Sequence, residues 1–262
     1  MTSSHMLKQS DNERISAMRE GGKILARVRE EIVRTIQPGV SFEELEQTAQ
    51  LWLKKLRAEP SFPTVEGYQW ATCITKNEGC CHGIPKNGVV NNGDIMTIDT
   101  GALYKGYHTD TSITVCAGTC TKEVLRFLEV GRQALKAAIA RVLPGNTIYV
   151  VSQAMQDVIE KAGYRSVYQL TGHGIGKTLH MLPNIPCYAD ERSKKDIIQE
   201  GQTLAIEPMY AWGNPTLALG KDGWTYETVD KSLTGMFEHT VVAWNDGPEV
   251  LTDSPLEKGQ GI

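Results

Sequence analysis

Apolar residues recur every three or four positions in two long segments of the chain, and each segment ends at a Pro-Gly pair. The first segment covers residues 22–36 and is followed by Pro38-Gly39. The second covers residues 131–143 and is followed by Pro144-Gly145. This spacing predicts two amphipathic helices, because a helix presents the same face every 3.6 residues and ends before such a pair.

A second helix is predicted after each Pro-Gly pair. Ser41 is placed to cap a helix over residues 42–58, which begins with acidic residues and ends with basic ones. Thr147 is placed in the same way before a helix over residues 148–164. The same order of elements therefore occurs twice, which indicates an internal repeat.

The repeat continues into strands that end in carboxylates. The apolar run DIMTI precedes Asp99, and the run QTLAI precedes Glu207 at the equivalent place in the second half. Each half supplies one more acid just before a β-rich run, Asp110 before TSITV and Glu238 before HTVVAW. If the halves pack about a pseudo-twofold axis, their strands join in one antiparallel-rich sheet with helices on its outer side. This α+β architecture would bring the four carboxylates together.

Carboxylates that leave a buried sheet without a partner are costly, and they either become protonated or bind a cation. The segment TGHGIGKT predicts a tight turn in which flanking glycines present His173. One imidazole with four carboxylates suits two divalent first-row ions such as Mn, Fe, Co or Zn, and it indicates a dinuclear hydrolase. The same segment does not fit a phosphate-binding loop. Position 171 is Thr rather than Gly, and Pro183 and Pro186 exclude the helix that such a loop opens.

The composition is that of an ordinary globular protein, with 40% hydrophobic and 22% charged residues among 262. The 27 basic and 31 acidic residues give a net charge of -4, the wrong sign for a nucleic-acid partner. No apolar run approaches the roughly 20 residues of a spanning helix, and the polar start lacks a signal-type segment. We therefore expect a cytoplasmic protein with no membrane partner, whose six cysteines are reduced and mostly serve in packing.

From about residue 19 to residue 251 the chain resembles the type I methionine aminopeptidases of the bacterial kind, which have the pita-bread fold. The resemblance rests on the motifs NEGCCHGIP, GDIMTIDTG, HTDTS, TGHGIGKTLH, IEPM, KDGWT and FEHTVV. It implies that the metal ligands are Asp99, Asp110, His173, Glu207 and Glu238, with Asp110 and Glu238 bridging two divalent ions.

The resemblance also implies which residues surround the metals. His180 would stabilise an oxyanion, and His82 would bond the peptide nitrogen of the second substrate residue. Glu207 would carry a proton between the metal-activated water and the leaving amine. The substrate-binding residues would be Tyr68, Cys73, His82, His180 and Trp224.

The implied function is removal of the initiator methionine from nascent proteins and peptides that have a small second residue. We expect a leader over residues 1–18, one catalytic domain over residues 19–252 and a tail over residues 253–262. The expected partners are peptide or nascent-chain N-termini near the ribosome, and the enzyme is expected to be a monomer.

Two alternatives stay open. One is an Xaa-Pro aminopeptidase or prolidase of the same fold, although those enzymes usually carry an extra N-terminal domain. The other is a non-catalytic pita-bread binding protein, although such proteins lose ligands that this chain keeps. The chain also departs from the family's usual pattern at Leu179, where Phe is common, and at Met181, where an acidic residue is common.

Overall fold

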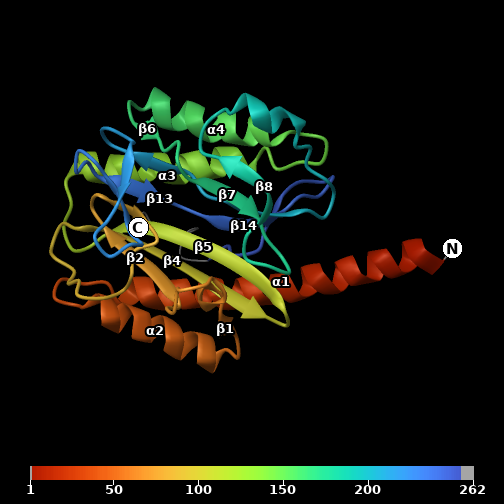
Figure 1. Ribbon diagram of the computed structural model, residues 1–262, viewed down its shortest axis with the longest axis horizontal. Helices are drawn as coiled ribbons and strands as arrows, with labels where there is room; N and C mark the ends of the chain where they lie inside the picture. Colours follow the sequence, from red (N-terminus) through yellow and green to blue (C-terminus); the bar gives the residue numbers. More distant parts are fainter. Residues whose placement is uncertain (1, 255–262) are drawn as a thin grey trace.

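The computed structural model describes the backbone of residues 2–254 and the side chains of residues 11–254. Two helix pairs flank a curved layer of strands, with α1 and α2 along one side and α3 and α4 along the other (Figure 1). The helices are α1 (Thr2–Thr35), α2 (Phe42–Lys55), α3 (Lys122–Ile139) and α4 (Ile148–Lys161), and the short 3-10 helices are η1 (Phe62–Thr64) and η2 (Glu191–Lys195).

Four strands of the first half form an antiparallel sheet in which β4 pairs with β1, β2 and β5. Its long central strands are covered by α1, which also packs against α2. The strands are β1 (Glu59–Pro60), β2 (Thr72–Lys76), β3 (Gly79–Cys81), β4 (Ile95–Tyr104) and β5 (Tyr107–Cys116).

The second half contributes a five-stranded sheet in the order β15-β14-β9-β7-β8 and a three-stranded sheet, β13-β10-β6. A further three-stranded sheet, β11-β12-β3, combines two strands of the second half with β3 of the first. All of these pairings are antiparallel. The strands are β6 (Arg165–Ser166), β7 (Thr171–Gly174), β8 (Met181–Pro186), β9 (Thr203–Ile206), β10 (Met209–Ala211), β11 (Leu217–Leu219), β12 (Tyr226–Thr228), β13 (Thr234–Met236), β14 (His239–Val242) and β15 (Glu249–Val250).

The predicted α+β fold class and the repeat of helix pairs are confirmed. The strands of the two halves, however, do not join in the one continuous sheet that was predicted. Strand β5 of the four-stranded sheet contacts β14 of the five-stranded sheet and β13 of a three-stranded sheet. Across this boundary the Glu238 amide donates to the Ser112 carbonyl at 3.0 Å. Within residues 11–254, the other hydrogen bonds between these strands involve the hydroxyls of Thr111, Thr114 and Thr240, which do not extend a regular ladder.

Two predicted helix starts were wrong because the apolar stripe continues further toward the N-terminus. Helix α1 begins at Thr2 rather than near residue 22 and continues through the predicted domain boundary at residue 19, and Ile15 and Met18 are buried. Helix α3 begins at Lys122 rather than near residue 131, since Thr121 caps it and Phe127 is buried one turn later. In the predicted tail, residues 255–262 lie outside the described part of the chain. The domain boundaries therefore stay predictions.

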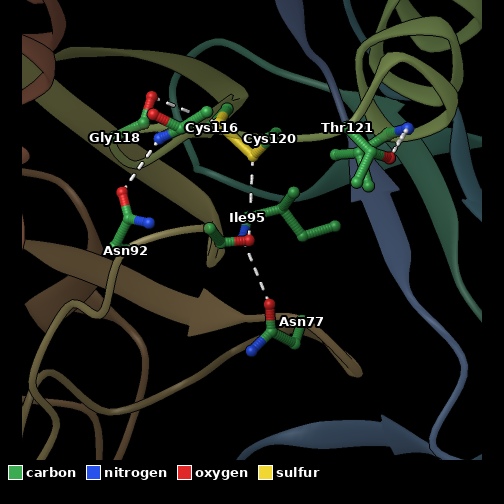
Figure 2. The surroundings of a disulfide bond; sticks show 10 residues. Asn77, Asn92, Ile95, Cys116, Gly118, Cys120 and Thr121 are labelled. Carbon is green, nitrogen blue, oxygen red and sulfur yellow. Dashed lines mark hydrogen bonds between the residues drawn. A yellow bond between two sulfur atoms is a disulfide. The ribbon is translucent and has the colours of Figure 1, made fainter.

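The expectation that all cysteines are reduced was wrong at one place. A disulfide joins Cys116, at the end of β5, to Cys120 (Figure 2). Gly118 has φ of 72° and turns the chain back, so that the two Cα atoms lie 6.2 Å apart, within the range a disulfide spans. The other four cysteines are reduced and buried, as expected. The expected cytoplasmic location and the spacing of the cysteines did not reveal the turn that brings this pair together.

No helix in the described part of the chain combines the length and the apolar character that crossing a membrane requires.

We predict that the two equivalent helix caps contribute unequally to stability. The Ser41 hydroxyl accepts from the Glu44 amide at 3.2 Å, and the Glu44 carboxylate accepts from the Ser41 amide at 2.8 Å. Thr147 caps α4 by position but makes no such side-chain bond. Ser41→Ala should therefore lower the free energy of unfolding by about 1 kcal/mol, and Thr147→Ala by less than about half of that. Urea unfolding measures both, and equal losses would contradict this account.

Candidate active site

Strands β4 and β5 place the first two carboxylates on one face of their sheet. The register pairs Asp99 with Ser112 and Asp110 with Gly101, so the two acids are diagonal neighbours on the same face. Asp99 lies in the middle of β4 and does not end it, and Asp110 lies within β5 and does not precede it, which corrects both predictions. The strand begins at Tyr107 because Lys105 and Gly106, with φ of 50° and 79°, form a tight two-residue hairpin turn.

Strands β7, β9 and β14 bring the other three predicted ligands together. Glu207 directly follows β9 and Glu238 directly precedes β14, and the ladder between these strands pairs Ile206 with His239. Both carboxylates therefore leave the same end of the ladder. On the other side of β9, His173 pairs with Ala205, two residues before Glu207 and on the same face.

The glycines beside His173 belong to a strand and not to the predicted tight turn. A Cβ atom at Gly172 would lie 2.5 Å from the Ala205 carbonyl oxygen, and one at Gly174 would lie 2.3 Å from the Leu182 carbonyl oxygen. Only glycine fits at both places, because the neighbouring strands approach the backbone of β7 closely. The glycines thus allow His173 to sit in the middle of a densely packed sheet.

Two threonines hold the backbone where the sheets of the two halves meet, and each bonds a residue of the opposite half. The Thr240 hydroxyl accepts from the Asp110 amide and donates to the Asp110 carbonyl, both at 2.8 Å. The Thr111 hydroxyl donates to the Glu238 carbonyl at 2.8 Å and accepts from the buried Arg29 guanidinium at 2.5 Å. Since each half holds the carboxylate residue of the other, the spacing between Asp110 and Glu238 is set by main-chain contacts.

The five predicted metal ligands all face one buried region. Ligand atoms of Asp110, His173 and Glu238 lie within 4.8 Å of one another. His173 Nε2 lies 3.6 Å from Glu207 Oε1. One oxygen each of Asp99 and Glu238 is buried without a hydrogen-bond partner among the described residues. Buried carboxylate oxygens without donors are what a divalent cation would satisfy, so these residues fit a metal site.

Burial changes the protonation of the same five groups. It raises the pKa of Asp99 to about 7, and it raises the pKa values of the other three carboxyls well above their usual range. Repulsion between the carboxylates adds to this effect. Burial also lowers the pKa of His173 to about 4, which keeps its imidazole neutral and able to bind a metal at neutral pH.

A cavity of about 320 Å³ contains these groups and all the other predicted site residues. Its apolar part is closed by aromatic rings, with the Tyr68 and Trp224 rings 5.0 Å apart in an edge-to-face arrangement. Asp222 holds Trp224 in place, because its Oδ1 accepts from the Trp224 and Thr225 amides, each at 2.9 Å. The ten predicted residues that line the cavity are Tyr68, Cys73, His82, Asp99, Asp110, His173, His180, Glu207, Trp224 and Glu238.

His82 and His180 are exposed side chains that reach the cavity from two different connections. His180 lies between β7 and β8, with its ring 4.6 Å from the His173 ring and edge-to-face to it. His82 follows β3 with φ of 57°, a left-handed conformation that costs a non-glycine residue about 1 kcal/mol. The next residue, Gly83, lies close to β2, since a Cβ there would lie 2.2 Å from the Ile74 carbonyl oxygen.

Several lining residues were not identified from the sequence. Met209 lies in the motif IEPM, and Thr171 and Asn184 lie near the histidines, so these could have been suspected. Phe62 and Val65 carry no local signal, because the chain around η1 approaches the cavity only in the folded protein. The lining residues that were missed are Phe62, Val65, Cys81, Gln169, Leu170, Thr171, Asn184, Met209 and Met236.

The sequence of the chain is similar to known metallopeptidases. The model of "Metallopeptidase family M24" matches residues 16–243. The chain is 37% identical to methionine aminopeptidase 1 of Bacillus subtilis over 238 residues, which cover 91% of this chain and 96% of that protein.

The fold is also similar to those of solved structures. Methionine aminopeptidase from Thermotoga maritima matches with a TM-score of 0.89 at 36% identity, covering 92% of this chain and 97% of that one. Prolidase from Pyrococcus furiosus matches with a TM-score of 0.74 at 23% identity, covering 92% of this chain and 64% of that one. The second likeness shows the shared fold alone.

We predict that a divalent metal stabilises the protein more as the pH rises from about 5 to about 8. In the metal-free protein the native carboxyls hold protons that the unfolded chain has already released. The free energy of unfolding therefore falls as the pH rises from about 4 through about 7, the value for Asp99. A divalent ion replaces these protons, so the increase in Tm produced by Mn²⁺ over EDTA should grow across the same range.

The matched control is the double variant Asp110→Asn/Glu238→Gln, which keeps the shape of the site but removes two of its charges. We expect it to show a flatter pH dependence in EDTA and little stabilisation by Mn²⁺. A metal-induced shift in Tm that is constant or decreases with pH in the unmodified protein would contradict the prediction.

Proposed function

The chain belongs to metallopeptidase family M24, and from this premise we propose that it is a methionine aminopeptidase. It removes the N-terminal methionine from peptides and nascent proteins whose second residue is small. The relatives that are 34–37% identical over most of the chain carry this name.

One observation carries the proposal. A single cavity joins a group of buried metal-binding side chains to an apolar chamber bordered by aromatic rings. Methionine is long, unbranched and polarizable, so it suits a chamber formed by Tyr68, Cys73 and Trp224. Burial raises the pKa of the Cys73 thiol well above its ordinary value, so this side chain is neutral and apolar.

We propose that Asp110 and Glu238, together with Asp99, His173 and Glu207, would hold two divalent ions of Co, Mn, Fe or Zn. The donor set of one imidazole and four carboxylates supports ions of this kind. When bound, the ions would polarise the scissile carbonyl and lower the pKa of a water molecule. A free α-amino group would bind on the Asp99 side, which would restrict cleavage to chain ends.

The remaining residues would act on the peptide itself. His180 would donate a hydrogen bond to the carbonyl oxygen as negative charge develops there. His82, which follows β3, would hold the peptide nitrogen of the second residue. Glu207 would move the proton between the attacking water and the leaving amine, because its carboxylate is buried in the cavity beside His173.

We further propose that the enzyme acts as a cytoplasmic monomer on N-termini near the ribosome, without a nucleic-acid or membrane partner. The net charge of -4 supports the absence of a nucleic-acid partner.

The direct test is a peptide series after loading the metal-free protein with Mn, Fe, Co or Zn. We expect rapid cleavage of Met-Ala-Ser, and at least about 10-fold lower kcat/KM for Leu-Ala-Ser, Lys-Ala-Ser and Ala-Ala-Ser, because an ill-fitting side chain costs at least this much. Comparable rates for all of these peptides would overturn the methionine assignment. Preferential cleavage of Gly-Pro would instead identify a prolidase, and no cleavage with any metal would favour a binding protein.

We predict that His180→Ala lowers kcat by about 10²-fold, the size of effect expected from the loss of one oxyanion donor. The metal content should stay at the wild-type value, because the exposed His180 is not among the five predicted ligands. Steady-state kinetics and elemental analysis measure the two quantities. A variant that lost its metal would show that His180 supports the metal site instead.

A further inference from the structure

A second groove, of about 820 Å³, opens beside the catalytic cavity along β8 and η2. Thr171 and Asn184 line both spaces, so the groove begins where the cavity ends. Neither side chain has a hydrogen-bond partner within residues 11–254. Both are therefore available to bond the backbone of a chain that passes from one space to the other.

Apolar side chains gather in this groove and remain exposed to solvent. Leu182 is 81% exposed, Ile197 is 53% exposed and Tyr168 is 47% exposed. The Tyr168 ring packs edge-to-face on Tyr188, with centroids 4.9 Å apart. A single exposed apolar residue needs no explanation, but several in one groove beside an active site indicate a binding surface.

The charged side chains of the groove balance one another, so they do not favour a partner of either charge. Asp190 and Arg192 form an ion pair at 2.7 Å, so their charges offset each other. The other charged side chains that line the groove are Lys195 and Asp196, which are also of opposite sign. A groove without net charge does not match a phosphate backbone or an anionic membrane surface, both of which need clustered cations.

The edge of the sheet also restricts how a partner can bind. Among the described strands, β8 pairs only with β7, which leaves its outer edge unpaired. Pro183 and Pro186 lack an amide hydrogen, so this edge cannot offer a regular ladder to an added strand. A chain in the groove would therefore be recognised through its side chains.

We propose that this groove binds the third and following residues of the substrate polypeptide and favours apolar side chains there. The proposal rests on the proposed function, since it extends the path of a chain whose first residue lies in the methionine chamber. The shared residues Thr171 and Asn184 mark the point at which the chain enters the groove. The substrates would then be polypeptides with apolar residues soon after the cleaved methionine, and short peptides would use only part of the binding surface.

The test compares kcat/KM for Met-Ala-Ser, for Met-Ala-Ser-Leu-Leu-Lys and for Met-Ala-Ser-Ser-Ser-Lys. The leucine peptide should exceed the serine peptide by about 10-fold, the scale of an apolar contact in a pocket. In Leu182→Ser and Ile197→Ser this ratio should fall toward 1. Leu51→Ser is the matched control, because Leu51 is 64% exposed on α2, away from the groove, and its ratio should stay at the wild-type value.

The outcomes separate the two proposals. Failure to cleave Met-Ala-Ser with any metal would overturn the proposed function. Cleavage of Met-Ala-Ser with equal rates for the two longer peptides would overturn the groove alone. Sedimentation velocity of the unmodified protein and of Leu182→Ser adds one more readout. A dimer that Leu182→Ser converts to monomer would assign the groove to a second copy of the chain and would also overturn the proposal.

Discussion

The burial of four carboxylates at one junction is the constraint on which the rest of the structure depends. Repulsion and the loss of water oppose this arrangement, and both are relieved when a cation binds. The backbone nevertheless holds the acids in place, because Thr111 and Thr240 bond the carboxylate residue of the opposite half. The fold thus holds these carboxylates in place without a metal. Binding of a cation would relieve the unfavourable free energy of burying them, and this relief would contribute to the affinity for the ion.

The internal repeat explains both the symmetry and the asymmetry of the site. Strand β4 contains Asp99 and β5 contains Asp110, whereas Glu207 directly follows β9 and Glu238 directly precedes β14. The neighbouring strands β2 and β7 differ in what they add. Strand β2 brings Cys73 opposite Asp99, whereas β7 brings His173 next to Glu207. One half therefore supplies an apolar wall and the other supplies a predicted metal ligand, so the two ends of the cavity differ chemically.

The walls of the cavity are coupled through a small sheet. Strand β12 pairs with β3, which precedes His82, and the turn that leads into β12 contains Trp224. The Tyr226 ring also packs against the His82 ring, with centroids 5.7 Å apart. A shift of this hairpin would thus move the apolar chamber and His82 together. This small sheet therefore positions two proposed features together. They are the apolar chamber for the first substrate residue and the histidine for the second.

The sequence by itself determined the repeat, the fold class and the set of ligand candidates, because helical spacing, Pro-Gly pairs and carboxylates after apolar strands are local signals. It did not determine where α1 and α3 begin, or that His173 lies in a strand. The glycines at 172 and 174 are required by the backbone of neighbouring strands, and only packing reveals those contacts. The Cys116–Cys120 disulfide spans only four residues, but it needs the left-handed turn at Gly118, which the cysteine spacing did not reveal. The places of Phe62 and Val65 in the cavity and the groove beside β8 depend on segments far apart in the sequence, and the tertiary structure alone decides them.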